Sequence, residues 1–346
     1  MQKKHIEKFF VTGLGFTGSG CILDWMREQE NVSVVPVRPF RYYSLSKLEK
    51  VNFSEQILNI INCRDVKTKK NLLVSIREDA ILRYENSLRE RQSNTLIAQL
   101  KKIKSLPEVY KKNKVKKDKK RMNPEIDSVR NSTEEFVFDI PYIDEHIKQL
   151  ENPLFDERRH WQDWFEKKIR SLWASKNRVV FDKSIPINKN RLQEFLDFYY
   201  PAKAIVSIRN PVDSIVDFYR IKSTSIDRDK QSTNVDQWIE ALNAKMDSSL
   251  EQLECLISFS QKQNSQFRLI GFEKFVLEHD SVAAEVAEWF GFQPKLTGYS
   301  HFNVKISSSN INIGKSYPLI AQLAKKHPYY TLWEELQCKE RWVRRQ

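Results

Sequence analysis

The chain lacks several features that would mark a membrane, secreted or metal-binding protein. No apolar run reaches the length of a membrane span, and the first residues lead into an expected strand without the apolar stretch of a signal peptide. The four cysteines, Cys21, Cys63, Cys255 and Cys338, are scattered and show no metal-ligand spacing. We therefore expect a soluble protein in a reducing, cytoplasmic setting, with no membrane span and no metal ion.

Positive charge is concentrated in one segment. The net charge is +13, but residues 101–121 hold eleven Lys or Arg residues and two acids, which is +9 of that total. The segment has one aromatic residue, Tyr110, and so offers no stacking surface for bases. We expect no nucleic-acid partner. Two interpretations stay open: a solvated, mobile excursion, or an electrostatic guide for an anionic acceptor, with a peripheral membrane contact as a variant.

Glycine is scarce, and half of it lies in one place. Four of the eight glycines are Gly13, Gly15, Gly18 and Gly20. A strand-like stretch precedes them and a helix-like stretch follows. Glycines let the backbone turn tightly and approach a ligand closely, while helix N-terminal N–H groups point at an anion. The sequence thus predicts a phosphate-binding loop at residues 13–20, which we call the glycine loop.

Strand-like and helix-like segments alternate along the chain. Expected strands cover residues 7–12, 32–37, 178–181, 203–208 and 267–272, and expected helices cover about 18–29, 157–173, 192–199, 210 onward, 235–263 and 281–290. This alternation predicts an α/β protein with a P-loop-like, three-layer fold, in which helices flank a central parallel sheet. We expect one α/β domain over residues 1–346 with a mostly helical, basic insertion at 38–176. Loops that follow parallel strands would converge on one rim.

The glycine spacing alone fits two nucleotide-binding patterns. Gly13 and Gly18 have the spacing of a kinase P-loop, but Ser19 and Gly20 stand where Lys and Ser/Thr should follow. The dinucleotide pattern also fits, yet residues 34–37 hold no acid at the place, about 20 residues on, where a ribose would need one. A P-loop kinase or nucleotide hydrolase remains one alternative.

A second segment favours another family. Residues 204–220 read as a strand, a turn of Arg209, Asn210 and Pro211, and a helix. They resemble the 3′-phosphate segment of sulfotransferases that use 3′-phosphoadenosine 5′-phosphosulfate (PAPS), and the glycine loop resembles that family's 5′-phosphosulfate loop. Further stretches agree in order, at residues 181–186, 270–275 with 288–292, and 313–315.

The resemblance implies a sulfotransferase that moves a sulfuryl group from PAPS to a hydroxyl or amine of a carbohydrate or another small acceptor. It implies donor-binding roles for the loop residues and for several side chains beyond it: Gly13, Gly15, Phe16, Thr17, Gly18, Ser19, Gly20, Arg209, Ser214 and Lys315. Arg209 would bind the 3′-phosphate through bidentate contacts. An ion pair with Asp213 is the alternative explanation for this arginine.

Two positions depart from the family pattern. Phe16 replaces the basic residue of the 5′ loop, and Asp217 replaces the serine expected eight residues after Arg209. Asp217 would repel a phosphate at close range, and Ser214, one helical turn earlier, is the substitute candidate. These departures support a second alternative, a non-catalytic nucleotide-binding module on a degenerate sulfotransferase fold.

Sulfuryl transfer needs a cation near the sulfuryl group and a base for the acceptor proton. Lys183 is the candidate cation, although an ion pair with Asp182 explains it as well. His160 and His301 are candidate bases, and each also fits an ordinary histidine. Glu28 is expected to be solvated. The tryptophans of 157–173 fit core packing or a sugar-stacking surface.

Overall fold

The computed structural model describes residues 6–15, 17–35, 41–44, 49–81, 139–172, 176–182, 185, 189–226, 235–262 and 265–338. It divides into two compact units. The first combines Met1–Val35 with Trp173–Gln346, and the second is Pro36–Leu172. One domain with an insertion at 38–176 stays a prediction, and the lysine-rich segment 101–121 lies outside the described residues.

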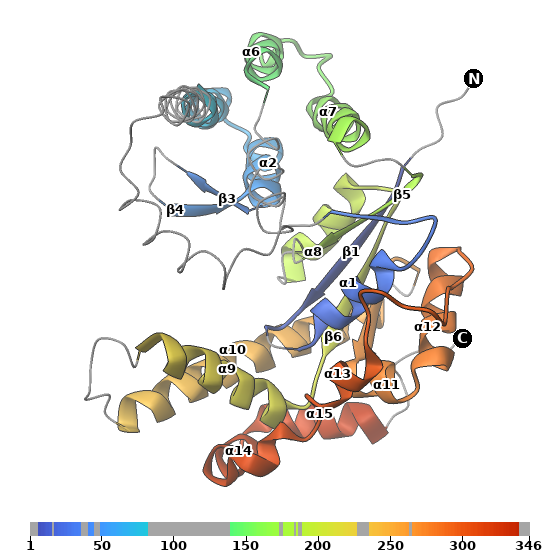
Figure 1. Ribbon diagram of the computed structural model, residues 1–346. Helices are drawn as coiled ribbons and strands as arrows, with labels where there is room; N and C mark the ends of the chain where they lie inside the picture. Colours follow the sequence, from blue (N-terminus) through green and yellow to red (C-terminus); the bar gives the residue numbers. More distant parts are fainter. Residues whose placement is uncertain are drawn as a thin grey trace, which may run out of the picture. The chain divides into compact units, whose positions relative to one another are not determined.

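The first unit contains a five-stranded parallel sheet in the order β2-β5-β1-β6-β7 (Figure 1). Its strands are β1 (Glu7–Gly13), β2 (Ser33–Val34), β5 (Arg178–Asp182), β6 (Ala202–Ile208) and β7 (Phe267–Gly271). The expected α/β class with a central parallel sheet flanked by helices is confirmed. Gly13 lies opposite Ser207 in the register of β1 with β6, so the carboxyl ends of these two strands are neighbours.

Helices connect and cover these strands (Figure 1). They are α1 (Ser19–Arg27), α8 (Lys189–Phe198), α9 (Pro211–Ile226), α10 (Val235–Ser260), α11 (Phe272–Leu277), α12 (His279–Phe290), α13 (Val304–Ser308), the 3₁₀ helix η1 (Ile313–Ser316), α14 (Pro318–Lys325) and α15 (Pro328–Cys338). Asn210 caps α9, because its side chain accepts a hydrogen bond from the Val212 N–H at 2.9 Å.

Apolar side chains cover both faces of the sheet, as expected for parallel strands buried between helices. On one face, Phe9 and Val11 of β1 join side chains of α1 and α12 in one core cluster. On the other face, the ring of Phe10 lies 4.7 Å from that of Phe195 in α8 and 5.3 Å from that of Tyr199. Alternate residues of β1 therefore anchor helices on opposite sides, and this fixes the strand end from which the glycine loop departs.

The prediction that Glu28 is solvated is wrong, because its side chain is buried. It is 7% exposed, and its carboxylate accepts backbone N–H groups of Ser300 at 2.7 Å and Phe302 at 3.1 Å, and also that of His301. Burial by itself would raise the pKa of Glu28, but these N–H donors outweigh it and hold the pKa below its usual value. The contact joins the end of α1 to residues 300–302.

The second unit is described by itself. It holds the antiparallel strands β3 (Arg41–Ser44) and β4 (Glu49–Asn52), then α2 (Phe53–Asn62), helical residues 66–81, α6 (Ile140–Gln149) and α7 (Glu157–Leu172). Trp161 and Trp164 of α7 are 1% and 2% exposed. Both rings therefore pack in the core of this unit, and neither is available as a sugar-stacking surface.

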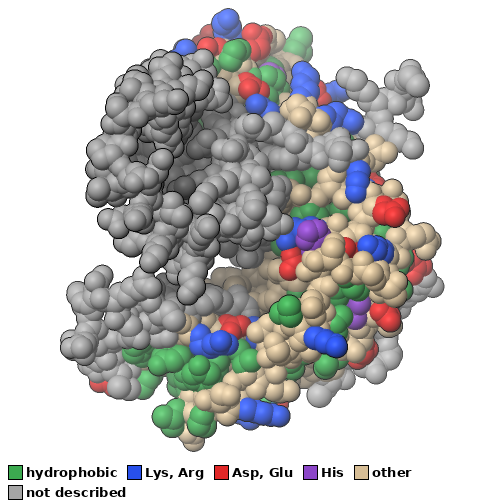
Figure 2. All heavy atoms as spheres, viewed as in Figure 1, with side chains coloured by type: hydrophobic (Ala, Val, Ile, Leu, Met, Phe, Trp, Pro, Cys, Tyr) green, Lys and Arg blue, Asp and Glu red, His purple; other side chains and the backbone are tan. Residues whose placement is uncertain are grey.

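The surface of the described residues carries mixed charge. Figure 2 shows Lys and Arg side chains interspersed with Asp and Glu on the visible face rather than gathered into one basic patch. Within the described part of the chain, no helix is both long and apolar enough to cross a membrane.

Candidate functional site

The glycine loop follows β1 and leads directly into α1. Gly15 and Gly18 have φ angles of +86° and +78°, a region that residues with side chains rarely adopt. A Cβ at Gly13 would lie 2.0 Å from Oγ1 of Thr17, and one at Gly18 would lie 2.1 Å from the ring of Phe272. The shape of the loop therefore requires these three glycines.

Gly20 differs from the other loop glycines. It lies in the first turn of α1 and is exposed, and a Cβ there would meet none of the described residues within 4 Å. Packing within the chain therefore does not explain this glycine. Open space at the N-terminal turn of a helix is what the close approach of a ligand to the backbone would need.

The groups around the loop favour an anion. The first turn of α1 contains no acid, and Gly18 precedes it without a side-chain cap. Thr17 is 2% exposed, and its Oγ1 has no hydrogen-bond partner among the residues that the structure describes. Ser207 of β6 donates from Oγ to the carbonyl oxygen of Thr17 at 2.6 Å, which fixes the loop to the neighbouring strand. A helix N-terminus without an acid attracts negative charge.

A lysine that sequence reasoning missed also reaches this loop. Lys245 of α10 is half-buried, and its Nζ donates to the carbonyl oxygen of Leu14 at 2.6 Å and to Oγ of Ser249 at 3.0 Å. Its Nζ lies 3.3 Å from the position that a Cβ on Gly15 would take. Burial lowers the pKa of Lys245. No motif marks this residue, which lies 231 positions from Leu14.

Arg209, the predicted 3′-phosphate ligand, is 3% exposed and already has partners within the protein. Its Nη1 lies 2.5 Å from Oδ2 of Asp217, and its Nη2 donates to the carbonyl oxygen of Asn310. Its guanidinium carbon lies 5.1 Å from the ring centre of Phe272, the ring that also packs against Gly18. Phe272 thus contacts both the glycine loop and the arginine.

The carboxylate of Asp217 contacts the guanidinium group of Arg209, which is the group that a phosphate would bind. It is also 3.5 Å from Nη1 of Arg220, so it stands between two arginines. A phosphate at Arg209 would meet this carboxylate, and like charges at such distances repel. The pairing therefore weakens the case for Arg209 as a 3′-phosphate ligand.

Asp213 is not the partner of Arg209. It is 2% exposed, and its carboxylate accepts the N–H groups of Asn312 at 2.7 Å and Gly314 at 3.0 Å. This contact joins the first turn of α9 to the late Gly-Lys stretch. Lys315 follows in η1 and is exposed, while Ser214 in α9 is 4% exposed. Two segments of the predicted donor site are therefore brought together, although Lys315 has a solvated side chain.

Neither predicted catalytic residue, Lys183 or His160, has a described position relative to this site. Phe16 and Lys183 lie outside the described residues. His160 belongs to α7 of the second unit, where its ring stacks on Tyr142 with centroids 4.0 Å apart. Burial and the nearby His146 lower the pKa of His160. Its role as a base stays a prediction.

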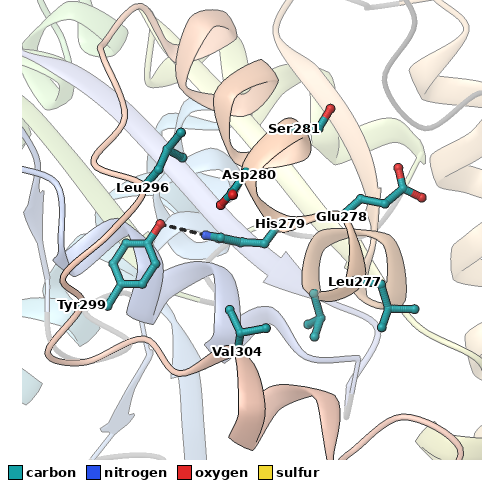
Figure 3. A pocket seen from close by; sticks show the side chains of 9 residues that line it. Leu277, Glu278, His279, Asp280, Ser281, Leu296, Tyr299 and Val304 are labelled. Atoms are coloured by element: carbon teal, nitrogen blue, oxygen red, sulfur yellow. Dashed lines mark hydrogen bonds between the residues drawn. The ribbon is translucent and has the colours of Figure 1, made fainter.

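A separate pocket of about 440 Å³ lies beside the junction of α11 and α12 (Figure 3). Its histidine, His279, is fixed at both ring nitrogens. Nδ1 lies 3.2 Å from the carbonyl oxygen of Phe275 and must donate, so Nε2 accepts from the Tyr299 hydroxyl at 3.0 Å. Burial lowers the pKa of His279, which keeps the ring neutral. None of the predicted donor-site residues lines this pocket.

Comparisons with known proteins give structural likeness alone. No protein-family model matches the chain, and no curated protein matches it. Among solved structures, the sulfotransferase domain of the olefin synthase from Synechococcus PCC 7002 aligns over 94% of this chain and 96% of that domain, with 9% identity and a TM-score of 0.41. A likeness at this level does not assign the chain to a family.

Proposed function

We propose that the chain is a sulfotransferase that moves a sulfuryl group from PAPS to a hydroxyl or amine of a carbohydrate or another small acceptor. The observation that supports it most is the position of two loops at neighbouring strand ends. The glycine loop follows β1 and the Arg209 turn follows β6, and Ser207 and Phe272 contact both sides. A nucleotide with a phosphate at each end needs two such sites, and the order of the sequence motifs agrees.

The proposed chemistry relies on positioning and electrostatic stabilisation. The acceptor oxygen or nitrogen attacks sulfur, the bond from sulfur to the 5′-phosphate oxygen breaks, and a base takes the acceptor proton. The products are the sulfated acceptor and adenosine 3′,5′-bisphosphate. In this scheme the N–H groups of the first turn of α1 and the Thr17 hydroxyl bind the 5′-phosphate. Lys183 and His160 remain the candidates for the cation and the base.

Ligand binding tests the proposal directly. We expect adenosine 3′,5′-bisphosphate to raise the melting temperature more than ATP with magnesium or NAD does, each at equal concentration. A ligand at 100 times its Kd adds about 2.7 kcal/mol to the free energy of unfolding. Release of the bisphosphate from PAPS, measured against a panel of hydroxylated acceptors, then tests transfer. A larger response to ATP with magnesium would contradict the proposal and favour a P-loop kinase or nucleotide hydrolase.

One observation favours a second candidate function. Phe16 stands where the resemblance leads one to expect a basic side chain that acts on the bridging oxygen, and this loss is expected of a nucleotide-binding module without catalysis. Such a module would bind the bisphosphate but release none from PAPS with any acceptor. The same pair of measurements separates it from an active sulfotransferase.

A further inference from the structure

The glycine loop contains no positively charged side chain, although the proposed donor would bring negative charge to it. The proposed donor carries phosphate and sulfuryl charge at its 5′ end, and main-chain N–H groups supply only partial positive charge. Position 16, where the resemblance leads one to expect a basic side chain, is phenylalanine. A cation must therefore come from elsewhere if this loop binds that end of the donor.

We infer that Lys245 of α10 supplies positive charge to the 5′-phosphate at the glycine loop, while Lys183 stays the candidate cation for the sulfuryl group. The inference rests on the proposed function and adds a residue to it. Lys245 reaches the loop from α10, where its Nζ donates to the carbonyl oxygen of Leu14, the residue before Gly15. An ammonium group carries three protons, and the structure gives Lys245 two acceptors, Leu14 and Ser249.

The charge balance around Lys245 separates a ligand-binding role from a purely structural one. Lysines that only stabilise a fold are usually paired with an acid or left in water. Lys245 is half-buried, and both of its partners are uncharged. Among the described residues, no carboxylate lies within ion-pair distance of it. A partly desolvated ammonium next to the exposed backbone of Gly15, without an acid as partner among the described residues, is complementary to an anion.

Lys203 of β6 provides a control in the same unit. It is also half-buried, donates to a backbone carbonyl, that of Trp289, and has a pKa lowered by burial. It lies near the start of β6, however, while the glycine loop follows the carboxyl end of β1. A substitution at Lys203 thus reports the general effect of removing a half-buried lysine from this unit.

The test compares Lys245→Met and Lys245→Gln with Lys203→Met, using three ligands and isothermal titration calorimetry. We expect either Lys245 variant to bind adenosine 5′-monophosphate and adenosine 3′,5′-bisphosphate about tenfold to a hundredfold more weakly than wild type. Binding of adenosine 3′-monophosphate should be unchanged, because it lacks the 5′ group. Lys203→Met should bind all three ligands as wild type does. Circular dichroism and the melting temperature of each ligand-free variant verify folding.

Other binding results would contradict either the role of Lys245 or the identity of the donor. Equal loss for all three ligands, or no loss for the 5′-phosphates, overturns the role of Lys245 while leaving the donor intact. If wild type binds none of the three nucleotides, the proposed donor is wrong. The lysine is then tested with inorganic phosphate and sulfate, which should raise the melting temperature of wild type and not that of Lys245→Met. Equal shifts in both proteins would show that Lys245 binds no anion there.

Discussion

The glycine loop and the Arg209 turn, the two ends of the candidate donor site, differ in whether an acid is paired with their positively charged side chain. At the glycine loop, Lys245 donates to a carbonyl and a hydroxyl oxygen, its hydrogen-bond partners among the described residues. At the start of α9, Arg209 is paired with Asp217 and also binds the Asn310 carbonyl. The same ring, that of Phe272, packs against both ends. Lys245 at the loop end thus has no acid as partner among the described residues, whereas Arg209 is paired with one.

This difference shows that a basic residue in a motif is not sufficient to identify a phosphate ligand. Arg209 has the motif, and its charge is compensated inside the protein. Lys245 has no motif, and its charge is not compensated among the described residues. The free charge of a site depends on which acids reach it, and only the packed structure supplies that information.

The largest expected effect comes from breaking the link between the two ends. Gly18→Ala should lower the free energy of unfolding by about 2–5 kcal/mol, since a positive φ costs about 1–2 kcal/mol and forcing Phe272 aside costs about 1–3 kcal/mol. Urea denaturation measures it. Gly298→Ala is the control, because Gly298 has φ +68° but its nearest atom lies 3.9 Å away. Equal losses in the two variants would mean that Phe272 does not constrain Gly18.

Removing the acid at the arginine end should make the two ends more alike. Asp217→Ser takes the carboxylate away from Arg209, so the preference for adenosine 3′,5′-bisphosphate over adenosine 5′-monophosphate should rise about tenfold, as expected for a charge-assisted contact. The ligand-free protein should melt at a lower temperature, because Arg209 loses its partner. Asp247→Ser, on α10, is the control. An unchanged preference would show that Arg209 does not face the 3′-phosphate.

The loop end should respond to alkaline pH. Burial lowers the pKa of Lys245 below its ordinary 10.5, so the ammonium loses its proton earlier than an exposed lysine. We expect bisphosphate affinity to fall about twofold to tenfold between roughly pH 8 and pH 10, and Lys245→Arg to keep its affinity there. Because the unfolded state binds this proton more tightly, the ligand-free protein should gain stability over the same interval. A parallel decline in both proteins would assign the pH effect to another group.

The smallest effect concerns Gly20. Gly20→Ala has space for its methyl group, and alanine favours helix, so the free energy of unfolding should rise by about 0.5 kcal/mol. If the donor approaches this backbone closely, the same change should weaken bisphosphate binding about threefold or more. Stability and affinity would then move in opposite directions. A gain in stability with unchanged affinity would place the donor away from Gly20.

Much of the fold could be predicted from local sequence patterns. The strands at β1, β5, β6 and β7 and the helices α8 and α10 follow from runs and periodicities of apolar residues, and the turn of residues 209–211 correctly precedes α9. The short helices α11 and α13 were not foreseen, because a single turn or two of helix gives little periodicity. The burial of Glu28 was also missed, since its partners are the N–H groups of residues 300–302.

The sequence by itself indicated the α/β class and the glycine-rich turn after the first strand, because alternating strand-like and helix-like runs and closely spaced glycines can be recognised within short stretches of chain. Only the tertiary structure decided which charges are compensated at the site. Asp217 reaches Arg209 across two turns of a helix, and Lys245 reaches Leu14 from a distant one. Such contacts depend on how helices pack on the sheet, and no local pattern of residues encodes them.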